Sequence, residues 1–260
     1  MEVVIVPSPE DMGRVVADAV EALVSRRPDA VLGLATGSSP VPVYDELVTR
    51  CHRGELSFAR CRAFLLDEYV GLPCGHRESY LSVIERTFTG RVDFASGRVL
   101  APDGSAADLA RASAAYETAI AEAGGIDLQL LGLGSDGHIA FNEPGSSLGS
   151  RTRLKTLTAR TRHDNARFFG SLDEVPHHVL TQGVATILSA RHLVLVASGH
   201  AKAAPVAAAL EGPVTAFVPA SALQLHPHVT VVLDDAAASD LALADYHRET
   251  WAGKPAWQGL

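Results

Sequence analysis

The chain has 260 residues, of which 47% are hydrophobic and 20% are charged, and its formal net charge is −8. This composition is ordinary for a globular protein, and the negative charge argues against a nucleic-acid backbone as its main partner. No apolar run approaches the roughly 20 residues that a membrane-spanning helix needs, so we also expect no membrane partner. The first residues, MEVVIV, lack the basic region of a signal peptide and are typical of a first strand. We therefore expect a cytoplasmic protein.

Short apolar runs alternate with amphipathic segments along the whole chain. Ser8-Pro9-Glu10-Asp11 is a helix start, with an N-cap serine, a proline at the first helical position and acidic residues in the first turn. We predict strands at residues 3–6, 30–34, 61–66, 128–133, 151–157, 192–197 and 229–233. We predict helices at residues 9–26, 41–53, 78–88, 106–123, 181–189, 201–210 and 236–247.

This alternation of strands and helices predicts parallel βαβ units. The expected fold is therefore α/β, a three-layer α/β/α arrangement around an open, mostly parallel, Rossmann-like sheet. The chain has no internal repeat, no low-complexity tract and no evident linker. We therefore expect one domain over residues 1–260.

Cysteine and histidine usage gives no sign of a disulfide framework or a metal site. The three cysteines are odd in number and lack C-x-x-C spacing, which is typical of reduced thiols; they are Cys51, Cys61 and Cys74. The histidines form no H-E-x-x-H motif, and the His177-His178 and His226-Pro-His228 groups are too close-set for a convincing metal site. We expect no metal and no cofactor.

A glycine-rich polar loop follows the predicted strand at residues 128–133. Its glycines allow the strand to become a loop, and it carries Asp136, His138 and Glu143. Carboxylates beside an imidazole can fix the tautomer and orientation of the ring and favour its protonated form, which acid–base catalysis needs. The simpler alternative is a turn with a solvated histidine.

Three further features fall at strand ends or helix starts. The first is a turn before a predicted helix, Thr36-Gly37-Ser38-Ser39-Pro40, whose hydroxyls and backbone N–H groups suit an anion such as phosphate. A plain capped turn is the alternative. The G-K-[ST] ending of a P-loop is missing. Asp67 directly ends an apolar strand, where it points a carboxylate into the crevice or caps the next turn. Arg167 and Lys202 are candidate phosphate ligands or ordinary surface charges. Lys202 lies at a helix start, where a cation opposes the helix dipole, and this hints at a bound anion.

Six segments then match one known family in the family's order. They are LATGSSP (34–40), LDEYVGLP (66–73), GSDGHIAFNEP (134–144), SRTRLK (150–155), NARFF (165–169) and LQLHP (223–227). With these segments, which span about residues 33–233, the chain resembles glucosamine-6-phosphate deaminase, also called glucosamine-6-phosphate isomerase. GSDGHIAFNEP is a highly specific motif, and its occurrence together with DEYVGLP makes chance similarity improbable.

The resemblance implies conversion of D-glucosamine 6-phosphate and water to D-fructose 6-phosphate and ammonia, without a cofactor. It implies that His138 opens the sugar ring, that Asp136 and Glu143 orient and charge the imidazole, and that Asp67 moves a proton between C2 and C1. The sugar-phosphate substrate would be bound through its phosphate by Thr36, Gly37, Ser38, Ser39, Arg167 and Lys202.

The resemblance also implies a mobile lid at about residues 157–177, which would carry Arg167. Some bacterial members are hexamers with an allosteric site for N-acetylglucosamine 6-phosphate, and Ser146, Arg153 and Lys155 match the phosphate-binding residues of that site. A C-terminal tyrosine of that site has only Tyr246 as a nearby candidate here. A homo-oligomer is favoured, but a hexamer and a monomer both stay open, as does activation by the effector.

Two other functions remain as alternatives. 6-Phosphogluconolactonase shares the fold and a similar G-x-D-G-H loop, but Asp67-Glu68-Tyr69 and Asn142-Glu143-Pro144 favour the deaminase. A sugar-phosphate sensor on this fold generally carries a DNA-binding domain, for which this chain has neither the room nor the positive charge. The preference between glucosamine and galactosamine epimers is left open.

Overall fold

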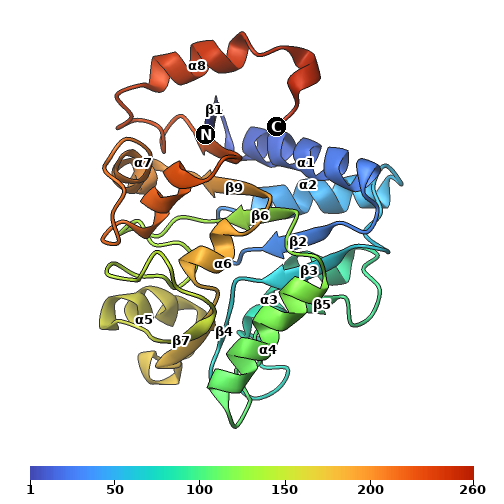
Figure 1. Cartoon of the computed structure of the whole chain (residues 1–260), viewed down its shortest axis with the longest axis vertical. Coiled ribbons are helices and arrows are strands. Elements are labelled where there is room, and N and C mark those ends of the chain that lie inside the picture. The colour runs from blue at the N-terminus through green and yellow to red at the C-terminus, as the bar shows by residue number, and fades with distance from the viewer.

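A seven-stranded parallel sheet forms the centre of the molecule in the computed structural model (Figure 1), which describes residues 1–260 apart from the side chains of Arg160, Asp164 and Ala256. The strand order is β1-β10-β9-β6-β2-β3-β5, and every neighbouring pair is parallel. The strands are β1 (Glu2–Val6), β2 (Val31–Leu34), β3 (Arg62–Leu65), β5 (Val99–Leu100), β6 (Leu128–Leu131), β9 (His192–Ala197) and β10 (Val229–Asp234).

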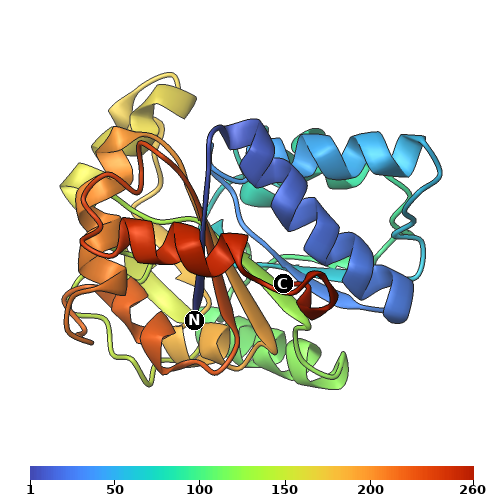
Figure 2. The same ribbon diagram turned by 90° about the horizontal axis from the view of Figure 1, so that it is seen from above.

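The central strands are covered on both faces, as their continuous apolar sequences predict. All residues of β2, β6, β9 and β10 are buried. Helices α1 and α2 pack against each other on one side of the sheet, and α4 lies on the other side (Figure 2). The predicted three-layer arrangement around an open, mostly parallel sheet is therefore confirmed.

Eight α-helices accompany the strands in the described part of the chain. They are α1 (Pro9–Arg26), α2 (Val41–His52), α3 (Tyr80–Thr87), α4 (Leu109–Glu122), α5 (Ala159–Asn165), α6 (Val184–Leu188), α7 (Ala203–Leu210) and α8 (Ala244–Ala252). Helix α1 begins as predicted, because the Ser8 hydroxyl accepts a hydrogen bond from the backbone N–H of Asp11. None of the helices among the described residues is long and apolar enough to cross a membrane.

A second, three-stranded antiparallel sheet lies beside the first and has the order β4-β8-β7. Its strands are β4 (Asp67–Tyr69), β7 (Arg153–Thr156) and β8 (His178–Thr181). The sequence predicted β7 but neither of the other two strands of this sheet. The expected helix at 181–189 is wrong at its start, because Thr181 pairs with Asp67 in the sheet and helix α6 begins only at Val184.

The predicted position of the last helix, residues 236–247, is also wrong at its start. The backbone after β10 first turns back onto Asp234, whose side chain accepts hydrogen bonds from the N–H groups of Gly199 and Ala237. The Glu211 carboxylate then accepts the N–H groups of Ala242 and Leu243, immediately before α8. These long-range contacts delay the helix until Ala244, where it lies across β1 near both chain termini (Figure 1).

Candidate active site

The candidate residues meet at the carboxyl edge of the parallel sheet, where open α/β sheets place their sites. The 36–39 loop follows β2, the 132–145 loop follows β6, and Lys202 follows β9. Asp67 opens β4, and a single residue separates it from the end of β3. Strands that are distant in sequence therefore deliver the candidate groups to one edge.

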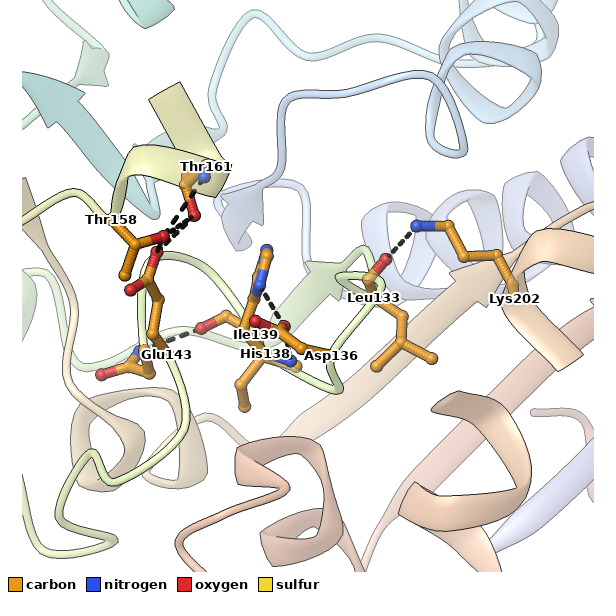
Figure 3. Close-up of polar contacts among 9 residues, drawn as sticks. Leu133, Asp136, His138, Ile139, Glu143, Thr158, Thr161 and Lys202 are labelled. Carbon is orange, nitrogen blue, oxygen red and sulfur yellow. Dashed lines mark hydrogen bonds and ion pairs between the residues drawn. The ribbon is translucent and has the colours of Figure 1, made fainter. Parts of the chain in front are cut away.

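Asp136 and His138 form a direct pair in the loop after β6 (Figure 3). His138 Nδ1 lies 2.6 Å from Asp136 Oδ1, and Asp136 also accepts the backbone N–H of His138. The hydrogen bond from the His138 ring is the main reason that the pKa of Asp136 falls to about 2. Asp136 therefore stays ionised at neutral pH and holds the imidazole in one orientation.

The backbone of this loop is built around the His138 ring. A Cβ atom on Gly134 would lie 2.2 Å from the ring, so only glycine fits there. Ala140 has a φ of 50°, and it is the one non-glycine residue with a positive φ in the described backbone. Such a conformation costs free energy and is often found at functional sites.

Asp67 is a buried carboxylate with only 5% of its surface exposed. Among the described residues, no donor forms a hydrogen bond with its side chain. Burial, and next the negative charge of Glu68, raise the pKa of Asp67 well above its usual value. A carboxylate with such a raised proton affinity is suited to accept and return a proton.

Glu68 does not share this role, and its carboxylate instead caps the start of helix α3. Its carboxylate accepts the backbone N–H groups of Tyr69, Tyr80 and Leu81, at distances of 2.8 to 2.9 Å. Two of these groups belong to the first turn of α3, where free N–H donors favour a carboxylate. Glu68 thus fixes the chain immediately after Asp67.

The second sheet joins Asp67 to the loop that carries His138. Asp67 pairs with Thr181 in β8, and the Thr181 hydroxyl accepts the backbone N–H of Phe141. The buried Asn142 amide donates to the carbonyl groups of Ile139 and Gln182 at 3.0 and 2.8 Å. The end of β8 therefore supports both Asp67 and the loop that carries His138.

Glu143 is buried at the end of the same loop, but it does not bond to His138. Its Oε1 atom instead accepts the Thr161 hydroxyl at 2.5 Å, and the Thr158 hydroxyl lies 3.3 Å away (Figure 3). No hydrogen bond among the described residues joins Glu143 to the His138 ring. Of the two carboxylates expected to orient the imidazole, only Asp136 contacts it in this structure.

The candidate phosphate ligands are arranged less tightly. Lys202 Nζ donates to the Leu133 carbonyl at 2.7 Å, which places this ammonium group at the start of the catalytic loop (Figure 3). In the 36–39 loop, Gly37 has a φ of 102°, Thr36 is half-buried, Gly37 and Ser38 are exposed, and Ser39 is buried. The exposed Arg167 guanidinium lies 4.7 Å from the centroid of its neighbour Phe168, and no described contact joins it to that loop.

The candidate allosteric residues are divided between surface and interior. Arg153 and Lys155 lie two apart on β7 and share one face, as the sequence predicted. Ser146 is buried, with 4% of its surface exposed, and its hydroxyl has no hydrogen-bond partner among the described residues. The three residues therefore do not form one exposed patch here.

Sequence reasoning missed Glu68, Thr158 and Thr161 as residues that support the site. Thr158 could have been found as a helix N-cap, since its hydroxyl accepts the Thr161 N–H at the start of α5. Nothing local pointed to the contact with Glu143. Among the described residues, no group of three or more His, Cys, Asp or Glu side chains is arranged to hold a metal ion.

Comparison with known proteins identifies the family of the chain. A family model described as glucosamine-6-phosphate isomerases/6-phosphogluconolactonase matches residues 9–232. Glucosamine-6-phosphate deaminase of Mycolicibacterium smegmatis is 63% identical over the full length of both chains. A solved monomeric glucosamine-6-phosphate deaminase matches with a TM-score of 0.90 and 41% identity, over 92% of this chain and all of that one. The 6-phosphogluconolactonase from Trypanosoma cruzi matches over 93% of this chain and 97% of its own with a TM-score of 0.75, but at 22% identity it shares only the fold. The chain therefore belongs to the family of glucosamine-6-phosphate isomerases and 6-phosphogluconolactonases.

Proposed function

We infer that this protein is a glucosamine-6-phosphate deaminase, which converts D-glucosamine 6-phosphate and water to D-fructose 6-phosphate and ammonia. The observation that carries the inference is the pairing of a buried Asp67 with an Asp136–His138 couple at one edge of the sheet. An aldose–ketose isomerisation needs one carboxylate at the reacting carbons and a separate acid–base group at the ring oxygen. Full-length identity of 63% to a deaminase supports the same reaction.

We propose that His138 opens the pyranose by exchanging a proton with the ring oxygen. Asp136 holds the ring nitrogen on the far side, so the other nitrogen is directed to the substrate. Asp67 then takes the proton from C2 and returns it to C1, and its raised proton affinity supports both halves of this step. Water attacks C2, the amine leaves as ammonia, and the carbonyl of fructose 6-phosphate remains.

The substrate phosphate is proposed to bind between the 36–39 loop and Lys202, with Arg167 arriving from the 157–177 segment. Backbone N–H groups before a helix and nearby cations are a suitable combination for a phosphate. Arg167 lies on its own neighbour in this structure, so its role requires the segment to move. We therefore propose that residues 157–177 form a lid over the site, within one domain of residues 1–260.

The quaternary structure belongs to the same proposal. We propose a homo-oligomer. We also propose a weak or absent response to N-acetylglucosamine 6-phosphate, because Ser146 is buried whereas Arg153 and Lys155 are half-buried on β7, and the C-terminal Tyr246 is exposed. The similar solved protein is described as monomeric. Sedimentation mass tests this directly, and a monomer would contradict the oligomer.

Ammonia release from glucosamine 6-phosphate by the purified protein tests the proposed function. We expect one ammonia for each fructose 6-phosphate formed, and no hydrolysis of 6-phosphogluconolactone above the spontaneous rate. Lactone hydrolysis without ammonia release would replace the deaminase with the alternative reaction of the family.

A further inference from the structure

We propose that Thr161 is a positioning residue for the deamination, because its hydroxyl holds the Glu143 carboxylate while the lid is docked. The inference rests on the proposed function, to which it adds a residue that the sequence motifs do not include. It concerns a contact between two separate parts of the site, the catalytic loop and helix α5 of the lid (Figure 3).

The contact is short, buried and directional. Thr161 Oγ1 lies 2.5 Å from Glu143 Oε1, and these two residues are 9% and 7% exposed. An ionised carboxylate has only acceptors, so the Thr161 hydroxyl must be the donor. Hydrogen bonds to ionised groups are shorter and stronger than neutral ones.

Thr158 fixes the direction of this bond. Its Oγ1 atom accepts the Thr161 backbone N–H at 3.2 Å and lies 2.9 Å from Thr161 Oγ1. Since the single hydroxyl proton of Thr161 goes to Glu143, Thr161 accepts in its contact with Thr158, whose own proton is shared between Thr161 Oγ1 and, at 3.3 Å, Glu143 Oε1. The result is a chain of donors from Thr158 through Thr161 to the carboxylate.

Thr161 takes on this role because no other donor among the described residues lies as close to the Glu143 carboxylate. Asp136 occupies His138 Nδ1, and the Glu143 carboxylate makes no hydrogen bond to His138. The lid also contacts the segment that follows Asp67, because Asn165 donates to the Tyr69 hydroxyl at 3.0 Å. Helix α5 therefore contacts the site at both ends, at Glu143 and two residues beyond Asp67.

Docking of the lid thus determines the position of a catalytic carboxylate. When the lid is docked, Thr161 holds Glu143 in a buried and fixed orientation. When it lifts, water replaces the hydroxyl and the side chain is free to rotate. Since Thr161 is not placed at the phosphate, losing its hydroxyl should lower kcat rather than raise KM.

The test is steady-state ammonia release by Thr161→Val and Thr161→Ser. Valine keeps the shape and removes the donor, so we expect kcat to fall roughly tenfold or more with KM within about threefold. Serine keeps the donor and should restore kcat to within about threefold. In a Glu143→Gln background, Thr161→Val should cause little further loss, because residues that act as one unit are not additive.

Thr186→Val is the matched control, because the Thr186 hydroxyl donates to the half-buried carboxylate of Glu117 outside the site, at 2.6 Å. It should lower the Tm and leave kcat unchanged. A Thr161→Val variant with wild-type kcat, or the same loss in the Glu143→Gln background as alone, would overturn the inference. Wild-type protein that releases no ammonia would instead overturn the proposed function itself.

Discussion

Replacing Asp67 with asparagine should change activity and stability in opposite directions. Asparagine keeps the shape of the side chain but cannot accept the proton, so we expect kcat to fall by roughly 10²–10⁴-fold, or about 2.7–5.5 kcal/mol of transition-state stabilisation. KM should change little, because Asp67 is not a proposed phosphate ligand.

The stability effect follows from the environment of Asp67. Its side chain is buried without a hydrogen-bond donor among the described residues, and its pKa is raised, by burial first and by Glu68 second. A carboxyl group whose pKa is higher in the folded state is destabilising wherever it must be ionised, that is, above its unfolded pKa of about 3.9. The neutral asparagine should therefore stabilise the fold at pH 7, and each gained kcal/mol would raise the Tm by roughly 2–4 °C.

Asp127→Asn is the matched control. Asp127 is equally buried, but Arg27, Arg191 and the Val31 N–H bond to it at 2.6 to 2.9 Å at the opposite edge of the sheet. Its replacement should lower the Tm and leave kcat unchanged. Calorimetry and ammonia release measure both effects, and an Asp67→Asn variant with near wild-type turnover, or with a lower Tm at pH 7, would refute the reasoning.

Three other outcomes follow from the structure. Lys202→Ala and Arg167→Ala should each raise KM for glucosamine 6-phosphate by at least tenfold, and equal kcat/KM for glucosamine and its 6-phosphate would exclude the phosphate site. The activity loss on the acid side of the kcat/KM profile should lie above pH 4, because Asp67 must be ionised to act as the base and its pKa is raised. Asp136, with its pKa of about 2, stays ionised over this range. An acid limb below pH 4 would point to another base. Glu117→Gln should cost about 1–2 kcal/mol of stability at pH 7, because this carboxylate accepts four hydrogen bonds, from Arg151, from Thr186 and twice from Thr152. Burial raises the pKa of Glu117, but these contacts lower it by more, so the difference in stability should shrink as the pH falls below about 4. A constant difference in Tm would contradict this.

Six strands of the parallel sheet could be predicted because they are short apolar runs with clear ends, whereas the two-residue edge strand β5 was missed. The runs at β2, β6, β9 and β10 are buried on both faces, and most of their residues are apolar. Helix α1 follows β1 and helix α2 follows β2, and both have local start signals: Ser8 caps α1, and each helix has a proline at one of its first two positions. These signals lie within a few residues of the elements they define.

The second sheet could not be predicted because its strands carry no such local signal. β4 consists of Asp67-Glu68-Tyr69, which resembles a polar strand end, and its partner β8 lies more than a hundred residues later. Long-range pairing outweighs local propensity in such short strands. The start of α8 depends in the same way on Glu211, which lies 31 residues before the first N–H group it accepts.

The candidate site shows the same difference between residues in local motifs, which could be predicted, and long-range contacts, which could not. The residues Asp67, Asp136 and His138 stand in specific motifs, and the structure brings them to one edge of the sheet. The bond between Glu143 and Thr161 joins side chains 18 residues apart, from a loop and a helix whose relative position only the folded chain determines. No spacing rule would have predicted it.

The division of labour between His138 and Asp67 is the central claim, and His138→Gln tests it most directly. The measurement pairs kcat for glucosamine 6-phosphate with the Kd for an open-chain 2-amino-alditol 6-phosphate, which needs no ring opening. The account predicts that kcat falls roughly 10²-fold or more while the Kd stays within about threefold of wild type. A near wild-type kcat, or a Kd that weakens as much as kcat falls, would contradict it.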